Sequence, residues 1–493
     1  MGGKRYCVAI DLGASGGKMS KVVFDGESIN IDNCIKFDNV PVSINNNLYW
    51  DLFDLYKSII KGLTAFAAEE GEIESIGIDT WGATYGFLDK KGRLAEPVFH
   101  YRDMRTETAL EDMYQKVSQR DIFDLTGCQC ARSYTLPQLF ASVDQHDTVL
   151  DTADKMLFLP DLLSYFLCGV KTTERTIAGT SALLDNSQEG WSFELLKKFD
   201  IPANLFTEIV EAGTVKGNIT EKIIRDTGIK NAKVVAVASH DSASAVAAIP
   251  GFGENNIYIS MGTNISMGIE SDTPGLSDLF YGGGFKNTGG LMKKVIIYRD
   301  FAAFWILNEL QSDWRRRGIE YSFDQMNHMA EGAMNSSYLN LDDKILNMAG
   351  DAMQDKIDKY LDMTNQPALH SHGEYVRCAF ESIALKVKNT VEDLKKATGK
   401  NFTGIYVISG GSRNKMLNRL ICDAVNTPLK AGLPYATIAG NALAQLYANG
   451  YASSLEQLRE ISENSFGMSL YKPEKLKNWD EALEFCIRIG ICV

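Results

Sequence analysis

A short loop of small residues between two apolar strands places the strongest limit on how this chain can fold. Residues 8–26 read VAIDLGASGGKMSKVVFDG, which predicts a strand, a turn and a second strand. Glycine-rich loops that bind phosphate usually lead from a strand into a helix, and the GxxxxGK[ST] pattern of such loops does not follow here. We therefore expect a β-hairpin, with backbone N–H groups at its tip that an anion can approach.

The second half of the chain repeats this order. Residues 257–270 read IYISMGTNISMGIE, again an apolar strand, a glycine turn and a strand. Continuous apolar strands are typical of sheets that helices cover on both faces. Further apolar runs begin at residues 75, 234 and 405, and helical patterns cover residues 52–71, 301–318 and 374–399.

The length and the repeated order predict two α/β domains. A chain of 493 residues is too long for one ordinary hydrophobic core. We place the boundary so that residues 1–245 form an N-terminal domain and residues 246–493 a C-terminal domain. Residues 118–228 carry more helical patterns and are expected to decorate the first domain.

Charge and composition exclude several classes of partner. A formal net charge of −13 argues against binding to nucleic acid or to an anionic membrane surface. The 9 cysteines are odd in number and scattered, which favours reduced thiols over a disulfide framework. No apolar run approaches the ~20 residues of a membrane helix. We therefore expect a cytoplasmic protein without nucleic-acid or membrane partners, and both a monomer and a homodimer remain open.

Five stretches, taken in order, resemble the FGGY family of carbohydrate kinases, within the superfamily of actin, hexokinase and the heat-shock ATPases. They read VAIDLGASGGK, SIGIDTWGA, YRDMRT, VAVASHDSASAV and GTNISMGIES, and the later stretch ISGGSRN resembles the adenosine motif. Within the family, their spacing is most similar to that of the rhamnulokinase group. The resemblance implies two actin-like or ribonuclease-H-like domains with a nucleotide cleft between them, and ATP and Mg²⁺ as cofactors.

Phosphoryl transfer needs neutralised phosphate charge and a group that orients or deprotonates the attacking hydroxyl. The resemblance implies that Asp11 holds Mg²⁺ through water, although a strand-end aspartate also commonly serves a turn. Lys18 would add a positive charge beside phosphate, or it is an ordinary solvated lysine. The expected nucleotide-binding residues are Asp11, Ala14, Ser15, Gly16, Gly17 and Lys18 in the first hairpin, Gly262 and Thr263 in the second, and Asn308, Gly410, Gly411 and Asn414.

Asp241 is the strongest candidate for catalysis. It follows the apolar run KVVAVAS, and the active sites of α/β proteins gather at the carboxyl ends of strands. The resemblance implies that Asp241 accepts the proton of a sugar hydroxyl; the alternative is that it caps the following helix. Trp81 would stack on the sugar or pack in the core. The expected sugar-side residues are Asp79, Trp81, Gly82, His240, Asp241, Ser242 and Asp300.

Several positions depart from the rhamnulokinase pattern. Ser242 replaces a threonine, and Thr84 stands where the pattern has an aspartate. Asn264 stands in place of a tryptophan, and Asp300 and Asn308 replace an asparagine and a glutamine. A lost hydroxyl-binding partner can change substrate discrimination by orders of magnitude. These changes therefore bear mainly on the identity of the sugar.

The sequence leads to one expected activity and several alternatives. We expect ATP-dependent phosphorylation of the primary hydroxyl of a ketose, with L-rhamnulose first. L-fuculose, xylulose, ribulose or a polyol are alternative acceptors within the same family. A non-catalytic sugar or nucleotide sensor and an actin-like or chaperone ATPase are alternatives of other classes; the aspartates of the motifs argue against the sensor, and the IDTWGA stretch argues against the ATPase.

Overall fold

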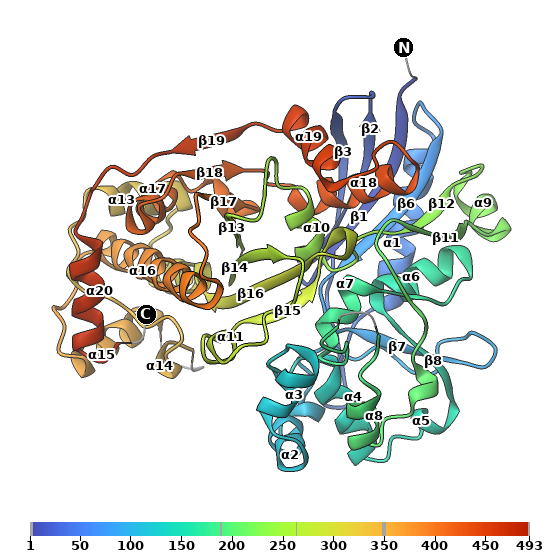
Figure 1. Ribbon diagram of the computed structural model, residues 1–493, viewed down its shortest axis with the longest axis horizontal. Helices are drawn as coiled ribbons and strands as arrows, with labels where there is room; N and C mark the ends of the chain where they lie inside the picture. Colours follow the sequence, from blue (N-terminus) through green and yellow to red (C-terminus); the bar gives the residue numbers. More distant parts are fainter. Residues whose placement is uncertain (1–2, 188–189, 263, 348–351, 492–493) are drawn as a thin grey trace. The chain divides into compact units, whose positions relative to one another are not determined.

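The computed structural model describes residues 3–187, 190–262, 264–347 and 352–491 (Figure 1). The chain forms two compact units, each built from segments that are far apart in sequence. Both units are α/β structures, as the sequence predicts. The units describe compactness alone, so the division into domains after residue 245 stays a prediction. Unit 1 comprises the chain up to Phe252 with Glu270–Ile297 and Tyr435–Phe466, and unit 2 comprises Gly253–Ile269, Tyr298–Pro434 and the chain from Gly467 onward.

Unit 1 is built on a 6-stranded mixed sheet in the order β11-β12-β6-β1-β2-β3 (Figure 1). Strands β1 and β2 pair antiparallel and form the expected hairpin, while β6 runs parallel to β1 on its other side. The strands are β1 Arg5–Gly13, β2 Gly16–Phe24, β3 Ile29–Asp38, β6 Ile73–Thr80, β11 Thr214–Asn218 and β12 Lys233–Ala236.

One face of this sheet carries the main hydrophobic core of unit 1. Val8, Ile10 and Leu12 of β1 are fully buried, and they share a core with side chains of two helices. These helices are α1 (Leu52–Ala67) and α6 (Leu159–Cys168). The alternation along β1 leaves the residues between them, including the aspartate of the hairpin, for the opposite face.

The opposite face is covered by α18 (Ala436–Ala448) beside α10 (Asp241–Ala247). Gly440 lets these two helices approach closely, because a Cβ there would lie 1.8 Å from the carbonyl oxygen of Ser244. Gly77 of β6 makes room for α18 in the same way, since its Cβ would meet side chains of that helix. Glycines on both sides of the contact therefore allow α18 to pack closely within unit 1.

A mainly helical part lies between β7 and β11 and has a hydrophobic core of its own. Its helical content agrees with the patterns predicted for residues 118–228. The elements of this part are β7 Tyr85–Asp89, η1 Met104–Thr106, α2 Ala109–Lys116, α3 Gln119–Thr126, α4 Thr135–Asp144, α5 Val149–Thr152, β8 Ala153–Phe158, β9 Thr173–Glu174, α7 Arg175–Ala178, η2 Gly179–Ser181, α8 Phe193–Lys198, η3 Ala203–Leu205 and β10 Ile209–Val210. The remaining elements of unit 1 are β4 Val42–Ile44, β5 Asn47–Tyr49, α9 Glu221–Thr227, α11 Asp278–Gly282, β15 Lys286–Gly289, η4 Leu291–Lys293 and α19 Leu455–Ser465.

Unit 2 is built on six strands of a second, 7-stranded sheet, in the order β16-β14-β13-β17-β18-β19. Strands β13 and β14 form the second predicted hairpin, and β17 runs parallel to β13. The strands are β13 Asn256–Met261, β14 Asn264–Ser271, β16 Val295–Ala302, β17 Gly404–Ile408, β18 Leu429–Gly432 and β19 Met468–Tyr471. The helices are α12 Phe304–Arg316, α13 Phe323–Glu331, α14 Lys344–Asn347, α15 Met353–Met363, α16 His372–Thr398, η5 Gly410–Arg413, α17 Lys415–Val425 and α20 Trp479–Arg488.

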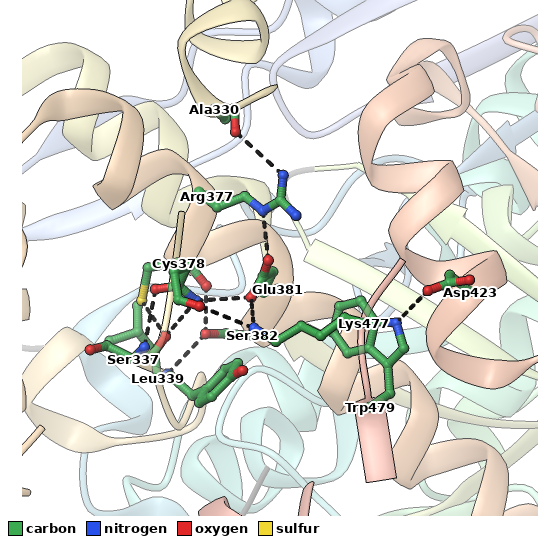
Figure 2. Close-up of polar contacts among 12 residues, drawn as sticks. Ala330, Ser337, Leu339, Arg377, Cys378, Glu381, Ser382, Asp423, Lys477 and Trp479 are labelled. Atoms are coloured by element: carbon green, nitrogen blue, oxygen red, sulfur yellow. Dashed lines mark hydrogen bonds and ion pairs between the residues drawn. The ribbon is translucent and has the colours of Figure 1, made fainter. Parts of the chain in front are cut away.

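A buried carboxylate on the 27-residue helix α16 fastens the C-terminal part of unit 2 (Figure 2). Glu381 is 1% exposed and accepts from Nε of Arg377 over 2.6 Å and from Nζ of Lys477 over 2.5 Å. Two residues after Lys477, Trp479 donates from Nε1 to Oδ2 of Asp423 over 2.8 Å. The segment that leads into α20 is thus held by side chains at two points.

Two predicted helix bounds need correction. Helix α12 begins at Phe304 instead of residue 301, because residues 301 and 302 still belong to β16, and α1 ends at Ala67 instead of reaching Gly71. Lys21 explains the early end, since its Nζ donates to the carbonyl oxygens of Phe66, Glu70 and Gly71 and binds the chain as it leaves the helix. Among the helices that the structure describes, every one is too short or too polar to cross a membrane.

Candidate functional site

Two aspartates lie next to each other near the carboxyl ends of neighbouring parallel strands in unit 1. Asp11 of β1 is paired in register with Asp79 of β6. Asp11 is 6% exposed and Asp79 is fully buried. Asn441 of α18 donates from Nδ2 to Oδ2 of Asp79 over 2.6 Å. The second oxygen of Asp79, Oδ1, has no hydrogen-bond partner among the residues that the structure describes.

Lys18 lies on the other side of Asp11, at the paired position of β2. Its Nζ is 3.3 Å from Oδ2 of Asp11, and its side chain is 41% exposed. Burial lowers the pKa of Lys18, but attraction to Asp11 outweighs this effect and leaves the pKa raised. Lys18 is therefore a partner of Asp11, with its charged end still open to solvent.

Burial raises the pKa of Asp11 to about 6; the charge of Lys18 opposes this shift, and the charge of Asp241 adds to it. Burial and the charge of Asp11 likewise raise the pKa of Asp79 well above its usual value. Adjacent carboxylates with raised pKa values retain their negative charge more easily when a cation is near. Asp11, Asp79, Asp241 and Lys18 thus form one group of residues whose charges influence one another.

This group fits a hydrated magnesium ion. Carboxylate oxygens are ligands that Mg²⁺ prefers, and the ion usually keeps several of its waters. In the described parts of the chain, no three His, Cys, Asp or Glu side chains are arranged to hold a metal directly. Asp11, which is less buried than Asp79, is the carboxylate of this pair that a hydrated Mg²⁺ could approach.

The tip of the first hairpin is a two-residue turn. Ala14 and Ser15 are exposed, and the turn joins paired Gly13 and Gly16. Gly17 is buried, and a Cβ there would lie 2.3 Å from the ring of Phe37. The missing side chain of Gly17 is thus explained by packing against β3, and the exposed turn is the part that a ligand can reach.

The second hairpin tip lies in unit 2. Gly262 is exposed, and its N–H donates to the carbonyl oxygen of Asn264 over 3.0 Å. Thr263, which is also expected to bind phosphate, lies outside the described residues. The backbone N–H of Gly262 already serves the hairpin, so any ligand contact of this glycine would come from its open surface.

Asp241 is the first residue of α10, directly after the segment that follows β12. Its side chain is 31% exposed, and its Oδ1 lies 3.5 Å from Nε2 of His240. Ser242 donates from Oγ to the same Oδ1 over 3.0 Å. The alternative that Asp241 caps α10 is wrong, because His240 occupies the cap position and no side-chain cap bond is formed there within the described chain.

The buried side chain of Thr180 packs against the turn that follows β6 and binds its backbone. Ala83 has a φ of 65°, a backbone conformation that non-glycine residues rarely adopt, and it donates from its backbone N to Oγ1 of Thr180 over 2.9 Å. A Cβ on Gly82 would lie 2.8 Å from the side chain of Thr180, so only glycine fits this position without movement. The conformation of the turn is thus fixed by local packing.

Trp81 and Thr84 form a buried pair beside this turn. Trp81 is 6% exposed, and its ring centroid lies 4.2 Å from that of Trp50. Nε1 of Trp81 donates to Oγ1 of Thr84 over 2.8 Å. The threonine that replaces the aspartate of the rhamnulokinase pattern therefore has a structural partner and is itself buried.

A cavity of about 410 Å³ in unit 2 is lined by most of the nucleotide-binding residues predicted for the second half of the chain. Gly411 is tightly enclosed, because a Cβ there would lie 2.5 Å from Cβ of Met261, whereas a Cβ on Gly410 would meet no described atom within 4 Å. The predicted lining residues are Gly262, Asn308, Gly410, Gly411 and Asn414, and those that sequence reasoning missed are Met261, Phe304, Phe323, Asp324, Asn327, Ser409 and Arg413.

Asn414 connects the cavity to a helix that the motif does not include. Its Oδ1 accepts from the backbone N of Leu417 over 3.0 Å and thereby caps α17. Its Nδ2 donates to Oδ1 of Asn327, on α13, over 3.0 Å. Ser322 and Gln325 form a capping box at the start of α13, which the sequence pattern could have shown, but no sequence signal assigned α13 to this cavity. Asp300, expected on the sugar side, is exposed on β16 of unit 2.

Comparison with known proteins identifies relatives of the whole chain. A family model described as the N-terminal domain of the FGGY family of carbohydrate kinases matches residues 6–248, and the corresponding C-terminal model matches residues 257–449. The chain is 33% identical over 489 residues to a rhamnulokinase of Bacteroides thetaiotaomicron, which covers 98% of this chain and 100% of the relative. It is 30% identical over 464 residues to a rhamnulokinase of Oceanobacillus iheyensis, which covers 94% of this chain and 97% of the relative.

Among solved structures, the chain is similar to the gluconate kinase from Lactobacillus acidophilus. The TM-score is 0.83 at 15% sequence identity, and the match covers 99% of this chain and 98% of the other. At this identity the likeness concerns the fold alone. It agrees with the two-domain α/β architecture expected from the sequence motifs.

Proposed function

The chain belongs to the FGGY family of carbohydrate kinases, and we propose that it phosphorylates the primary hydroxyl of L-rhamnulose with ATP. Membership of the family makes the chain a sugar kinase. The choice of sugar is supported by two relatives that are both named rhamnulokinase and match nearly the full chain. We place its action in the cytoplasm, as a monomer or a homodimer.

In this proposal Asp241 orients the sugar hydroxyl and accepts its proton. General-base catalysis requires a carboxylate that the substrate can reach, and Asp241 is 31% exposed. Ser242 fixes one of its oxygens by hydrogen bonding. His240 lies beside it and would shape the sugar pocket together with Gly82. Asp79 and Trp81 are buried, so they would act on the sugar side as support for the residues that touch it.

The nucleotide is proposed to use both units. In unit 2, the cavity lined by Asn308, Gly410, Gly411 and Asn414 would take the adenosine, with the rings of Phe304 and Phe323 as apolar walls. In unit 1, the exposed turn of Ala14 and Ser15 and the charged end of Lys18 would approach the phosphates, with Gly16 and Gly17 shaping the hairpin that carries them.

Mg²⁺ would be held near Asp11 through water, and Asp11, Asp79 and Asp241 would supply negative charge there. When bound, the ion neutralises phosphate charge during transfer. Lys18 shares its positive charge between Asp11 and the solvent side, and this arrangement suits an anionic ligand beside a metal-binding carboxylate.

The observation that carries the proposal is the association of an accessible aspartate with a buried pair. Asp241 is open to solvent, yet its charge acts on Asp11, and Asp11 is adjacent in register to Asp79. This combination supplies a group for the hydroxyl proton and a separate group for the metal, as phosphoryl transfer requires.

A panel of acceptors tests the choice of sugar. ADP release would be measured by a coupled assay with L-rhamnulose, L-fuculose, D-xylulose, L-ribulose and glycerol. The proposal requires the highest kcat/KM with L-rhamnulose. A higher value with another acceptor would assign that sugar instead, and tight nucleotide binding without ADP release from any acceptor would favour a sensor.

A second candidate is an FGGY kinase for a different ketose or polyol. It is favoured by Thr84, which has no carboxylate to offer a sugar. The hydroxyl of Thr84 is also buried and already accepts a hydrogen bond from the indole of Trp81. It is also favoured by the exposed carboxylate of Asp300. The same panel separates the two candidates.

A further inference from the structure

We propose that Glu174 and Thr176 are positioning residues that fix the backbone from which His240 and Asp241 project. This inference rests on the proposed role of Asp241 as the base, and it assigns a task to a buried carboxylate that phosphoryl transfer does not otherwise use. Neither residue belongs to the stretches that identify the nucleotide or the sugar side.

The backbone before Asp241 is bound by two different parts of unit 1. On β6, Thr80 donates from its backbone N to the carbonyl oxygen of Ser239 over 2.9 Å, and it forms a parallel bridge with His240. From the start of α7, Oε2 of Glu174 accepts from the backbone N of Ser239 over 3.0 Å, and Oγ1 of Thr176 accepts from the backbone N of His240 over 3.1 Å. Two consecutive N–H groups are therefore bound by one short segment.

The carboxylate of Glu174 is surrounded by donors. Its Oε1 accepts from the backbone N of Thr176 over 2.8 Å. Its Oε2 accepts from Oγ1 of Thr176 over 2.6 Å and from the backbone N of Ile177 over 3.2 Å, besides the bond from Ser239. Glu174 is fully buried. A buried carboxylate with this many donors is held in a single orientation, because any rotation would leave some of them unpaired.

The segment that carries Glu174 is itself held by hydrogen bonds to other parts of unit 1. Its backbone N lies 3.2 Å from Oδ1 of Asp161, which also accepts from Nζ of Lys216 over 2.5 Å. The next residue, Arg175, donates to the carbonyl oxygens of Gly290 and Lys294 over 2.9 and 3.0 Å. The segment is thus fixed to several elements before it binds residues 239 and 240, so it can act as a rigid support.

The charge state of Glu174 connects this support to pH. Burial raises the pKa of Glu174 to about 7, hydrogen bonds from Thr176 and Ser239 oppose the shift, and Asp161 adds to it. The charged or titratable groups around it are Asp161 on α6 with its partner Lys216 on β11, Arg175 on α7, and His240 before α10. Protonation would place an O–H where the neighbours are all donors, so the support requires the ionised form.

The matched variants Thr176→Val and Thr176→Ser test the inference. Valine removes the hydroxyl that binds both the Glu174 carboxylate and the His240 N–H, whereas serine retains it. Thr176→Val is expected to lower kcat by about ten-fold with the KM for ATP unchanged, since the partly buried N–H of His240 loses its acceptor. Thr176→Ser is expected to keep kcat within about two-fold of wild type.

A second pair of variants, Glu174→Gln and Thr173→Val, tests the pH dependence of kcat and separates it from an effect on folding. The wild-type enzyme is expected to lose kcat below about pH 7, where Glu174 becomes protonated, and Glu174→Gln is expected to lower kcat and to remove this pH dependence. Thr173→Val is the structural control, because Thr173 lies beside Glu174 and its buried hydroxyl bonds to Thr207 over 2.7 Å, away from residues 239–241. It is expected to lower the melting temperature without changing kcat.

Amide hydrogen exchange gives a readout that does not depend on activity. In Thr176→Val the amide of His240, and in Glu174→Gln the amide of Ser239, is expected to exchange faster than in wild type, while Thr173→Val leaves both unchanged. Unchanged exchange at both amides, or wild-type kcat in Thr176→Val, would overturn the positioning role. A wild-type enzyme that phosphorylates no sugar would instead overturn the proposed function, and the exchange result would still decide the positioning role.

Discussion

Asn441 and Asp79 are 362 positions apart in the sequence, yet Nδ2 of Asn441 lies 2.6 Å from Oδ2 of Asp79 in a fully buried setting. Among the described residues, this neutral amide donates the one hydrogen bond to the carboxylate, because Oδ1 of Asp79 has no partner. The contact joins α18 to the strand that lies beside the hairpin, and so it links helix packing to the electrostatics of the candidate site.

Replacing Asn441 tests this link. Asn441→Ala removes the donor and leaves Asp79 buried without a partner, which is expected to lower the free energy of unfolding by about 1–3 kcal/mol. Chemical denaturation measures the change. Asn449→Ala is the matched control, because Asn449 lies at the end of the same helix and donates to Oγ of Ser75 at a partly exposed position. Equal losses in the two variants would contradict the special role of the Asp79 contact.

The raised pKa of Asp11 predicts how stability depends on pH. Burial raises this pKa from 3.8 to about 6 in the folded chain. Because the folded chain binds the proton of Asp11 more tightly than the unfolded chain does, protonation of Asp11 stabilises the fold. This contribution is complete below about pH 3.8 and is lost as the pH rises through about 6. In the absence of Mg²⁺ and nucleotide, Asp11→Asn is therefore expected to raise the melting temperature at pH 8 relative to wild type, while turnover is lost.

Thermal unfolding at pH 5 and pH 8 checks this expectation. The gain from Asp11→Asn should be smaller at pH 5, where the wild-type carboxyl is mostly protonated. A variant that is less stable than wild type at pH 8 would show that the ion pair with Lys18 outweighs the cost of burying the charge.

Two neighbouring glycines separate ligand binding from folding in the unit 2 cavity. Gly410→Ala adds a methyl group with no described atom within 4 Å, so the melting temperature should stay within about 1 °C while the KM for ATP rises. Gly411→Ala places a Cβ 2.5 Å from that of Met261 and is expected to destabilise the fold by about 1–3 kcal/mol. Isothermal titration with ATP and thermal unfolding measure both effects. An unchanged ATP affinity in Gly410→Ala would remove this surface from the nucleotide site.

Glu381 provides a prediction for the C-terminal part of unit 2. Its buried carboxylate binds Arg377, Lys477 and Asn335, so Glu381→Gln leaves two partly buried cations with a weaker, neutral partner. We expect a loss of about 2–4 kcal/mol in the free energy of unfolding. Glu374→Gln, near the exposed start of the same helix, should cost less than about 1 kcal/mol. Similar costs in both variants would contradict the anchoring role of Glu381.

Much of the fold could be predicted because its signals are local. The two hairpins follow from apolar strands on both sides of small-residue turns, and the end of α16 just before Gly399 follows from helical periodicity and a glycine stop. The position of Asp241 after a buried strand was equally visible in the sequence.

The remaining features depend on contacts between distant segments. Nothing near Asp79 in the sequence indicates that Asn441 binds it, and nothing near the ISGGSRN motif indicates that Asn327 and Phe323 line the same cavity. Gly17 shows that a sequence signal can have another cause. Its place in a small-residue loop predicts phosphate binding, whereas the ring of Phe37 explains why no side chain fits there. A pattern shows which residues are small or polar, but only the fold shows what lies against them.

The turnover of Asp241→Asn tests whether Asp241 is the base that accepts the proton of the sugar hydroxyl. The amide keeps the size of the side chain but removes the proton acceptor, so kcat with the best sugar of the panel is expected to fall by about 10²–10⁴-fold. ATP affinity and the melting temperature should stay close to those of wild type, because the cavity proposed for adenosine lies in unit 2, whereas Asp241 lies in unit 1. A kcat near the wild-type value in a folded, ATP-binding Asp241→Asn would contradict the account.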